Sequence, residues 1–355
     1  MERADKGLAF LLQYENVAWY DRGAVRILDR RIYPGSVEFV TCARHEEVAQ
    51  AIADMVTQSG GPYTAAGMGM ALAAYEARDM DEASFEAHME NAAYTLSHAR
   101  PTTARRMESI TSGCLDSALA ARVAGAPADE AVRGHTVSVL DARYRRIAAI
   151  ADHLADMFPR KGVVMTQCFG EAIVGLMLRA AEERRLDIRL ICPETRPYFQ
   201  GARLTASVAR DMGFDVTVIT DNMPAYTIQR QKVDVFTSAA DAICMDGYVV
   251  NKVGTFQIAI VAKYFGVPYF VTGAPDRDHA SIDTVSIEER DPDFVLQAMG
   301  VPTAMPGVKG YYPAFDATPP HLVSGVVTDR GVFSPYDLER YFTDYDSDSG
   351  SGFLV

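Results

Sequence analysis

Polar side chains gather at four places where a predicted strand ends, and together they offer the groups that acid–base chemistry needs. The four groups lie at 166–168, 194–205, 240–241 and 246–255. In a parallel sheet the carboxyl ends of all strands lie along one edge, so groups that are distant in sequence converge there. A thiol and a carboxylate facing each other across such a crevice form an acid–base pair without a metal. The sequence therefore predicts Cys168 and Asp241 as the reacting pair.

Cys168 and Asp241 each have a second interpretation that involves no chemistry. Cys168 precedes Gly170 and a helix whose dipole is expected to lower the pKa of the thiol, but a free cysteine at a strand end is commonly a small buried apolar residue. Asp241 lies among alanines, where burial is expected to raise the pKa of its carboxyl toward that of a general acid. An aspartate at this place also suits the N-cap of a helix. The convergence of both residues at one edge favours the catalytic interpretation.

A candidate anion site follows at Asn251-Lys252, just before an apolar helix predicted over 256–264. Gly254 lets a ligand approach the backbone, and the free N–H groups, the lysine charge and the helix dipole together suit a phosphate. Arg100, which precedes Pro101, is a candidate second phosphate donor from the first half of the chain. The alternatives are an ordinary N-cap with a solvated lysine, and a surface arginine before a proline that starts a helix.

The strands that must position these groups belong to a βαβ pattern that begins after Lys161-Gly162. Apolar, β-rich runs alternate there with amphipathic helices, at spacings of roughly 20 to 35 residues that match parallel strands with crossover helices. The runs lie at 163–166, 188–192, 216–220, 233–236 and 269–272. The pattern predicts a Rossmann-like parallel α/β domain over 160–343.

The first half of the chain has helical spacing instead. Two short strands are expected within 16–34, around the turn Asp21-Arg22-Gly23, with a third at 37–41. From His45 to about Phe158 the apolar residues follow helical periodicity. The predicted fold class is therefore α/β, with a mainly helical domain and a small β cap over 1–159. The alternation of Asp, Ser and Gly over 344–355 predicts an acidic flexible tail.

The composition excludes several classes of protein. The net charge of −13 disfavours nucleic acid and acidic membranes as partners, because the field of the chain repels both. The five cysteines are widely spaced without a CxxC pair, so neither a disulfide scaffold nor a zinc site is predicted, and a reducing cytoplasm is the expected location. No apolar stretch reaches the roughly 18 residues of a membrane span. The seven histidines are scattered, so each is expected to be structural, and Gly67-Met68-Gly69 is too weak for a dinucleotide loop.

Three motifs stand out in the second half of the chain: residues 194–205 read ETRPYFQGARLT, residues 251–255 read NKVGT and residues 287–290 read IEER. These motifs resemble those of the 5-methylthioribose-1-phosphate isomerase family. Further similarities lie at 99–102, 267–271, 281–283 and 313–319, in the family's order, so that the resemblance covers nearly the whole chain. The same family includes ribose-1,5-bisphosphate isomerase and the regulatory subunits of eukaryotic initiation factor 2B.

The resemblance implies an aldose–ketose isomerase that converts a ribose 1-phosphate, or a 5-substituted relative, to the ribulose 1-phosphate. It implies that Asp241 protonates the ring oxygen while Cys168 assists hydrogen movement between C2 and C1, by a hydride or a cis-enolate route. The implied substrate-binding residues are Arg100, Gln200, Asn251 and Lys252. Within the loop at 194–205 we also expect Gly201 to hold the sugar phosphate with Gln200, and Arg196 and Arg203 to brace the loop. A homodimer, no cofactor and a place in methionine salvage are also implied.

Several residues around the predicted site depart from the family's pattern. The family's Arg-Gly-Ala-Pro-Ala-Ile-Gly loop is replaced around Tyr63, so one arginine that helps to hold the substrate is missing. The neighbours Gln167, Phe169, Ala242 and Tyr312 also differ. These changes predict an isomerase of the same chemistry with a different sugar or phosphate pattern. The alternative is a non-catalytic sugar-phosphate or nucleotide-binding regulatory protein; the retained Cys168 and Asp241 argue against it, and their altered neighbours argue for it.

Overall fold

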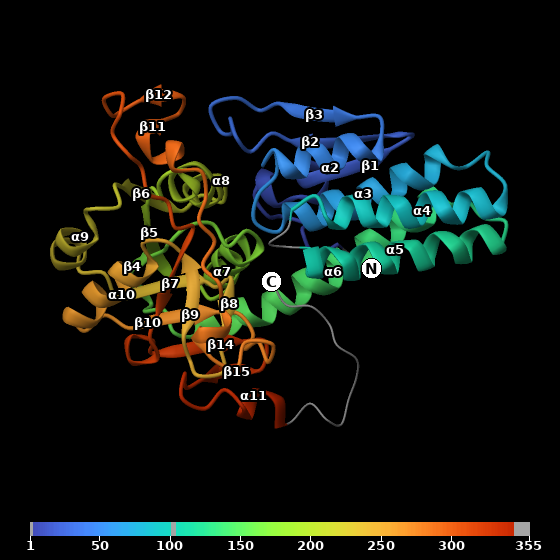
Figure 1. Ribbon diagram of the computed structural model, residues 1–355. Helices are drawn as coiled ribbons and strands as arrows, with labels where there is room; N and C mark the ends of the chain where they lie inside the picture. Colours follow the sequence, from blue (N-terminus) through green and yellow to red (C-terminus); the bar gives the residue numbers. More distant parts are fainter. Residues whose placement is uncertain (1–2, 101–103, 344–355) are drawn as a thin grey trace. The chain divides into compact units, whose positions relative to one another are not determined.

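The computed structural model describes residues 3–100 and 104–343 (Figure 1), so the predicted tail at 344–355 lies outside the described residues. The chain forms two compact units, Met1–Arg145 and Arg146–Val355. The division falls inside one long helix, α6 (Ala128–Ala155), so this helix contributes residues to both units. None of the helices in the described part of the chain is both long and apolar enough to span a membrane.

The first unit combines a small antiparallel sheet with a group of helices. Strands β1 (Ala18–Asp21), β2 (Ala24–Leu28) and β3 (Phe39–Cys42) pair in that order, which confirms the predicted hairpin and third strand. The helices are η1 (Phe10–Leu12), α1 (Tyr14–Val17), α2 (His45–Ala53), α3 (Gly61–Glu76), α4 (Glu82–Ser97), α5 (Ala104–Val123) and the first part of α6. The sheet packs on α2 and α3, so the β cap covers the helices as predicted.

Helix α3 is the buried centre of the first unit. It contacts α2, α4, α5 and strands β1 and β2, and most of its residues are buried. Its glycines permit this packing: a Cβ at Gly67 would lie 2.6 Å from Thr136, and one at Gly69 would lie 2.9 Å from Leu96 and 3.0 Å from Val48. The Gly67-Met68-Gly69 sequence is therefore a close-packing device within a helix, and no nucleotide loop.

The second unit is built on a seven-stranded sheet with the order β15-β14-β10-β7-β4-β5-β6. Six strands run parallel, and only β15 is antiparallel to its neighbour β14. The strands are β4 (Lys161–Met165), β5 (Asp187–Pro193), β6 (Asp215–Ile219), β7 (Val235–Ala239), β10 (Tyr269–Thr272), β14 (Gly325–Thr328) and β15 (Gly331–Phe333). The five predicted strands are confirmed, and β14 and β15 are additions at the edge of the sheet.

Numbered along the chain, the six parallel strands have the spatial order 3-2-1-4-5-6, which is that of a Rossmann fold. The order of the strands reverses between β4 and β7, and ligands of such folds bind at the carboxyl ends of the strands at this switch point. Cys168 follows β4 by three residues and Asp241 follows β7 by two. The topology therefore brings the two residues to the place where this fold binds its ligands.

A second, three-stranded sheet lies beyond the ends of the parallel strands. It consists of β8 (Ala242–Ile243), β9 (Val249–Lys252) and β13 (Phe315–Thr318), in the antiparallel order β13-β9-β8. Its register places Asn251 opposite Asp316 and Lys252 opposite Phe315. The remaining elements are α7 (Ala172–Glu183), η3 (Gly201–Thr205), α8 (Ala206–Asp211), α9 (Pro224–Gln231), α10 (Thr255–Tyr264), η4 (Ile282–Thr284), η5 (Pro292–Leu296), β11 (Gln297–Ala298), β12 (Val301–Pro302), η6 (Pro320–Leu322) and α11 (Arg340–Thr343).

Candidate active site

Two threonines of the loop at 194–205 hold the backbone of Cys168. The N–H of Cys168 donates to Oγ1 of Thr195 at 3.2 Å, and Oγ1 of Thr205 donates to the carbonyl oxygen of Cys168. Both threonines are buried, and Cys168 has a φ of +60°, a conformation that a side chain adopts only where its surroundings impose it. The loop therefore fixes the position of the thiol at the end of β4.

The loop is itself braced from three sides. The backbone N–H groups of Thr195 and Arg196 donate to the two carboxylate oxygens of Asp221, at 2.8 and 2.7 Å. The guanidinium of Arg196 donates to the carbonyl oxygen of Gln297 at 2.7 Å, which confirms that this arginine braces the loop. A Cβ at Gly201 would lie 1.9 Å from the carbonyl oxygen of Pro193, so only glycine lets the following π-helical turn, η3, approach the end of β5.

The pKa of the Cys168 thiol lies above its ordinary value. Burial raises it to about 11, against the opposing effects of the Lys252 charge and of the Phe169 backbone N–H. The prediction that a helix dipole lowers this pKa is therefore wrong. Helix α7 begins only at Ala172, four residues after the thiol, whereas desolvation acts directly on the sulfur. The thiol is protonated at neutral pH.

Asp241 is exposed in the structure, so the predicted burial of its carboxyl is wrong. The N-cap alternative is wrong as well, because Asp241 lies between β7 and the short strand β8 and no helix begins there. Its backbone N–H donates to the carbonyl oxygen of Val250 at 2.8 Å, which ties it to the strand that carries Lys252. The Asp241 carboxylate is close enough to act electrostatically on both the Cys168 thiol and the Lys252 ammonium.

Lys252 is a buried cation. Its side chain comes from β9 and is only 5% exposed, and Nζ makes no hydrogen bond to any residue that the structure describes. The ammonium lies 4.7 Å from the centre of the Phe315 ring and 5.8 Å from that of Tyr312. Burial lowers the pKa of Lys252, and the attraction of Cys168 and Asp241 opposes this shift. An anionic ligand would satisfy both the charge and the three N–H donors.

The N-terminus of α10 is occupied by a side chain of the protein. Asp316 accepts hydrogen bonds from the backbone N–H of Gly254 at 2.6 Å and from that of Phe256 at 3.2 Å. The prediction that free N–H groups at this helix bind a phosphate is therefore wrong, because a carboxylate 62 residues away in sequence caps them. Asn251 lies in buried strand β9 and donates to Oγ1 of Thr255 at 3.0 Å.

The Asp316 carboxyl makes stability depend on pH. Burial raises its pKa from 3.8 to about 6, although the backbone N–H groups stabilise the carboxylate. Because the folded-state pKa is raised, ionisation disfavours the fold, and stability is expected to fall as the pH rises from about 4 through 6. In urea unfolding the wild-type protein should therefore gain stability relative to Asp316→Asn when the pH is lowered from 7 to 5. A difference between the two proteins that does not change with pH would contradict this assignment.

Several buried polar atoms around this edge of the sheet make no hydrogen bond within the described chain. Among them are Oε1 of Gln167, Oε1 of Gln200 and Nζ of Lys252, whereas the hydroxyl of Tyr312 interacts with Arg290. Burial raises the pKa of the Tyr312 hydroxyl to about 12, so it is a neutral donor at physiological pH. Buried polar groups are almost always paired, so this set is suited to a ligand that carries several hydroxyl or phosphate oxygens.

Arg100 and Tyr63 belong to the first unit. Arg100 is half-buried and follows α4, and its predicted contact with a phosphate stays a prediction. Tyr63 lies in the first turn of α3 with the guanidinium of Arg143 5.4 Å from its ring centre. The roles of Thr195, Thr205 and Asp316 could not be predicted from sequence patterns, because these contacts join residues 27, 37 and 60 or more positions apart. Gly201 as a substrate ligand likewise stays a prediction.

Comparison with known proteins gives a consistent assignment. Residues 61–335 match the Initiation factor 2 subunit family. A methylthioribose-1-phosphate isomerase of Chloroflexus aurantiacus is 34% identical over 332 residues, which cover 89% of this chain and 94% of that protein. The crystal structure of 5-methylthioribose 1-phosphate isomerase from Pyrococcus horikoshii OT3 superimposes with a TM-score of 0.80 at 29% identity, covering 94% of this chain and 97% of that one.

A structure of the translation initiation factor eIF-2B, subunit delta, from A. fulgidus is also similar, with a TM-score of 0.77 and 30% identity over 90% of this chain and 96% of that one. Both kinds of relative thus share the two-unit fold and its Rossmann-like sheet. The match covers the cysteine, the aspartate and the lysine of the candidate site, and it extends well beyond half of the chain. The chain therefore belongs to the Initiation factor 2 subunit family.

Proposed function

We propose that the protein is an aldose–ketose isomerase that converts a ribose 1-phosphate, with or without a substituent at C5, to the ribulose 1-phosphate. The observation that supports the proposal is that Cys168 and Asp241 follow β4 and β7, the strands at the switch point of the sheet, and that both interact electrostatically with Lys252. The isomerase names of its relatives support the same reaction. A phosphate on O1 prevents the sugar ring from opening by itself, so the enzyme must supply a proton to the ring oxygen.

Asp241 is the group proposed to supply that proton, from the protonated form of its carboxyl. Protonation of the ring oxygen breaks its bond to C1 and leaves a cation at C1, next to the phosphate oxygen. A hydride then moves from C2 to C1, and the C2 hydroxyl loses its proton to give the ketone. That proton returns to the Asp241 carboxylate, so substrate and product are isomers and the enzyme ends in its starting state.

Cys168 is proposed to relay the returning proton. With a pKa of about 11 its thiol carries a proton at neutral pH, so it is poorly suited to act as the base that an enolate route requires. A protonated thiol can pass its own proton to Asp241 while it accepts the proton of the C2 hydroxyl. The electrostatic coupling of the thiol and this carboxylate supports the pairing. The hydride route is therefore the one we propose.

Lys252 is proposed to bind the phosphate, together with Arg100, Gln200, Gly201 and Asn251. The buried, unpaired ammonium supports this role, since a dianionic phosphate offers three strong acceptor oxygens. The departures from the family's pattern at Tyr63, Gln167 and Tyr312 support a sugar that differs from methylthioribose. Use of methylthioribose 1-phosphate itself would place the enzyme in methionine salvage.

The test is incubation of the protein in D2O with a panel of pentose 1-phosphates and 1,5-bisphosphates, followed by NMR. We expect a ketone carbon to appear for at least one compound, with no deuterium at C1 of the product because the hydrogen moves within the molecule. Deuterium at C1 would contradict the hydride route but would not contradict the isomerase activity. Tight binding of a sugar phosphate with no product from any compound would contradict the isomerase and favour the regulatory alternative, which the similarity to the initiation-factor subunit raises.

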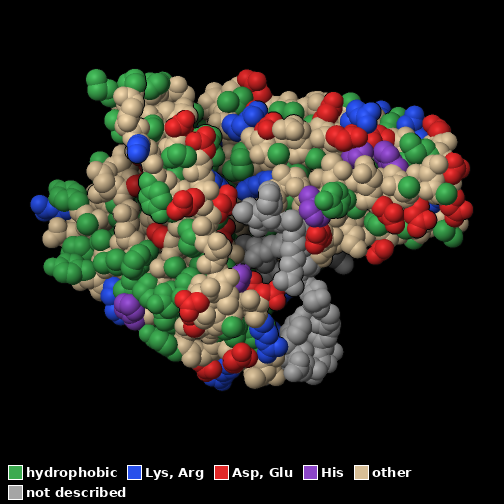
Figure 2. All heavy atoms as spheres, in the orientation of Figure 1, with side chains coloured by type: hydrophobic (Ala, Val, Ile, Leu, Met, Phe, Trp, Pro, Cys, Tyr) green, Lys and Arg blue, Asp and Glu red, His purple; other side chains and the backbone are tan. Residues whose placement is uncertain are grey.

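A homodimer is proposed from an exposed apolar surface of the second unit. Met223, which precedes α9, Tyr226 of α9, and Ile260 and Tyr264 of α10 are exposed, and apolar side chains gather over these two helices (Figure 2). Exposed patches of this kind commonly mark protein–protein interfaces. Light scattering should give a mass near twice 38.8 kDa, and Tyr264→Glu should lower it. The five free cysteines fit the cytoplasmic location that we also propose.

A further inference from the structure

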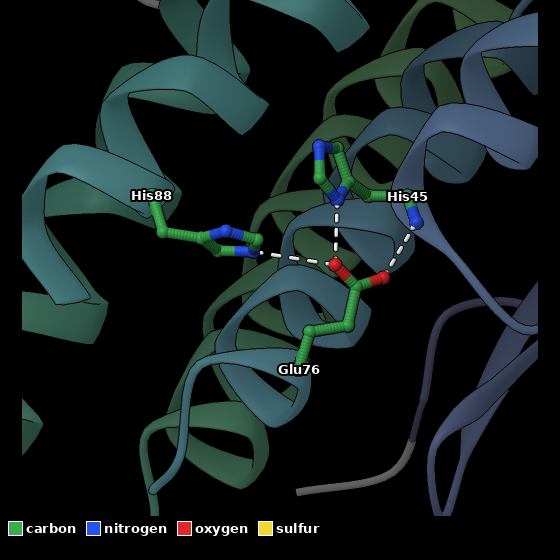
Figure 3. Close-up of side chains that lie close together, drawn as sticks. All are labelled: His45, Glu76 and His88. Carbon is green, nitrogen blue, oxygen red and sulfur yellow. Dashed lines mark hydrogen bonds and ion pairs between the residues drawn. The ribbon is translucent and has the colours of Figure 1, made fainter. Parts of the chain in front are cut away.

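Two histidines and a glutamate from three helices meet within the first unit. His45 begins α2, Glu76 ends α3 and His88 lies in α4, and their side chains point toward one another (Figure 3). Oε2 of Glu76 lies 2.7 Å from Nδ1 of His45 and 3.2 Å from Nε2 of His88. One potential ligand atom of each residue lies within 4.8 Å of those of the other two.

The helices that carry these residues are packed closely, so the cluster is held in place. Helix α3 contacts both α2 and α4, and Gly69 lets it approach Val48 of the one and Leu96 of the other. The glutamate is oriented as well, because Oε1 of Glu76 accepts the backbone N–H of His45 at 2.7 Å. Its second oxygen is thereby directed at the two imidazole rings.

Hydrogen bonding within the protein does not satisfy this cluster. Nε2 of His88 is buried and, although it is near the Glu76 carboxylate, it makes no hydrogen bond of acceptable geometry with the residues that the structure describes. Two imidazole nitrogens also crowd against a single carboxylate oxygen. An unpaired buried nitrogen beside a carboxylate is the arrangement expected where donor atoms converge on an ion.

The ligand types and distances suit a transition-metal ion. Two histidines and one carboxylate form a known ligand set for Zn²⁺, and tetrahedral bonds of about 2.0–2.1 Å place neighbouring ligand atoms about 3.3 Å apart. The separations of 2.7 and 3.2 Å differ from this value by less than an ångström. The side chains of Glu76 and His88 are 16% and 19% exposed, so an ion can enter from solvent and take a water molecule as its fourth ligand.

We propose that His45, Glu76 and His88 form a binding site for a divalent transition-metal ion such as Zn²⁺, which joins α2, α3 and α4. The sequence gives no indication of such a site, since the three residues are separated by 31 and 12 positions and match no metal-binding motif. Bound metal is expected to stabilise the first unit, because the three ligands separate when it unfolds.

The test is a calorimetric titration of Zn²⁺ into chelator-treated, full-length protein, with thermal unfolding in parallel. We expect one equivalent to bind per chain and Tm to rise. His88→Ala and Glu76→Gln should each weaken binding at least about tenfold and remove the rise in Tm. The matched control is His98→Ala, an exposed histidine that lies 3.5 Å from Glu108, and it should bind Zn²⁺ as the wild type does.

Cysteines are the competing ligands, so Co²⁺ is used as a second probe. The absorption spectrum of the Co²⁺-bound protein should lack a sulfur-to-cobalt charge-transfer band. The same spectrum should be obtained with the Cys168→Ser variant. Wild-type binding weaker than about 1 mM, binding unchanged in His88→Ala, or a sulfur band would each overturn the proposal. If His88→Ala does not fold, the Zn²⁺ affinity of Glu76→Gln tests the proposal instead. This variant is expected to fold, because the amide oxygen of glutamine still accepts the hydrogen bond from the His45 N–H.

Discussion

Cys168→Ser is expected to lower kcat about 10³-fold, a loss of roughly 4 kcal/mol in transition-state stabilisation, while the substrate still binds. Serine preserves the shape of the side chain and the hydrogen bonds that Thr195 and Thr205 make to the backbone. Its hydroxyl is far less acidic than a thiol, so it relays the proton of the C2 hydroxyl poorly. The measurement is single-turnover kinetics, with substrate affinity determined by calorimetry.

Cys114→Ser is the matched control for this prediction. Burial raises the pKa of the Cys114 thiol to about 11, as it does for Cys168, and serine can keep the contact with Oγ1 of Thr136. Turnover should be unchanged in this variant. Asp241→Asn should lose turnover to a similar extent, since an amide cannot protonate the ring oxygen. Full activity in either Cys168→Ser or Asp241→Asn would contradict the proposed roles.

Lys252→Met is expected to change stability and ligand binding in opposite directions. Methionine has a similar length and no charge, so it removes the cost of burying an ammonium that has no hydrogen-bond partner among the described residues. Unfolding free energy should rise by about 1–3 kcal/mol, as it does when buried ionic groups are replaced by apolar ones of similar volume. Affinity for a sugar phosphate should fall by about 10- to 100-fold, the equivalent of one charge-assisted hydrogen bond.

The opposite signs separate this prediction from general damage to the fold, which would lower both quantities. Lys263→Met serves as the control, because Lys263 is an exposed residue in the last turn of α10. It should leave both urea unfolding and ligand affinity unchanged. A Lys252→Met protein that is less stable than the wild type, or that binds phosphate equally well, would show that Lys252 has a structural partner and another role.

The sequence predicted the convergence of Cys168 and Asp241 correctly because one geometric rule sufficed. Both follow parallel strands, and the ends of parallel strands share an edge whatever the details of packing. The strands at 188–192 and 269–272 could be predicted from their composition, since strands buried on both faces are continuously apolar. Strands β14 and β15 were not predicted, because each contributes only two apolar residues next to a glycine, against three in β10.

The electrostatics of the site could not be predicted in the same way. The pKa of the Cys168 thiol depends on how much protein surrounds the sulfur, which the position of the nearest helix does not reveal. The cap on α10 depends on Asp316, which reaches Gly254 only because β13 pairs with β9. Such long-range contacts depend on the whole fold. The local sequence around α10 therefore predicted that its free N–H groups bind a ligand, whereas in the structure the Asp316 carboxylate accepts their hydrogen bonds.

The threonine contacts to Cys168 also constrain how this enzyme can evolve. Because Thr195 and Thr205 hold the cysteine, a mutation that reshapes the loop at 194–205 to admit another sugar also displaces the thiol. Selection for a new substrate must then act through positions that leave the loop intact. The loop keeps the family's motif, whereas the departures from the family's pattern lie outside it, at Tyr63, Gln167 and Tyr312. Sequence change in this chain is therefore found where it leaves the two threonine contacts to Cys168 unchanged.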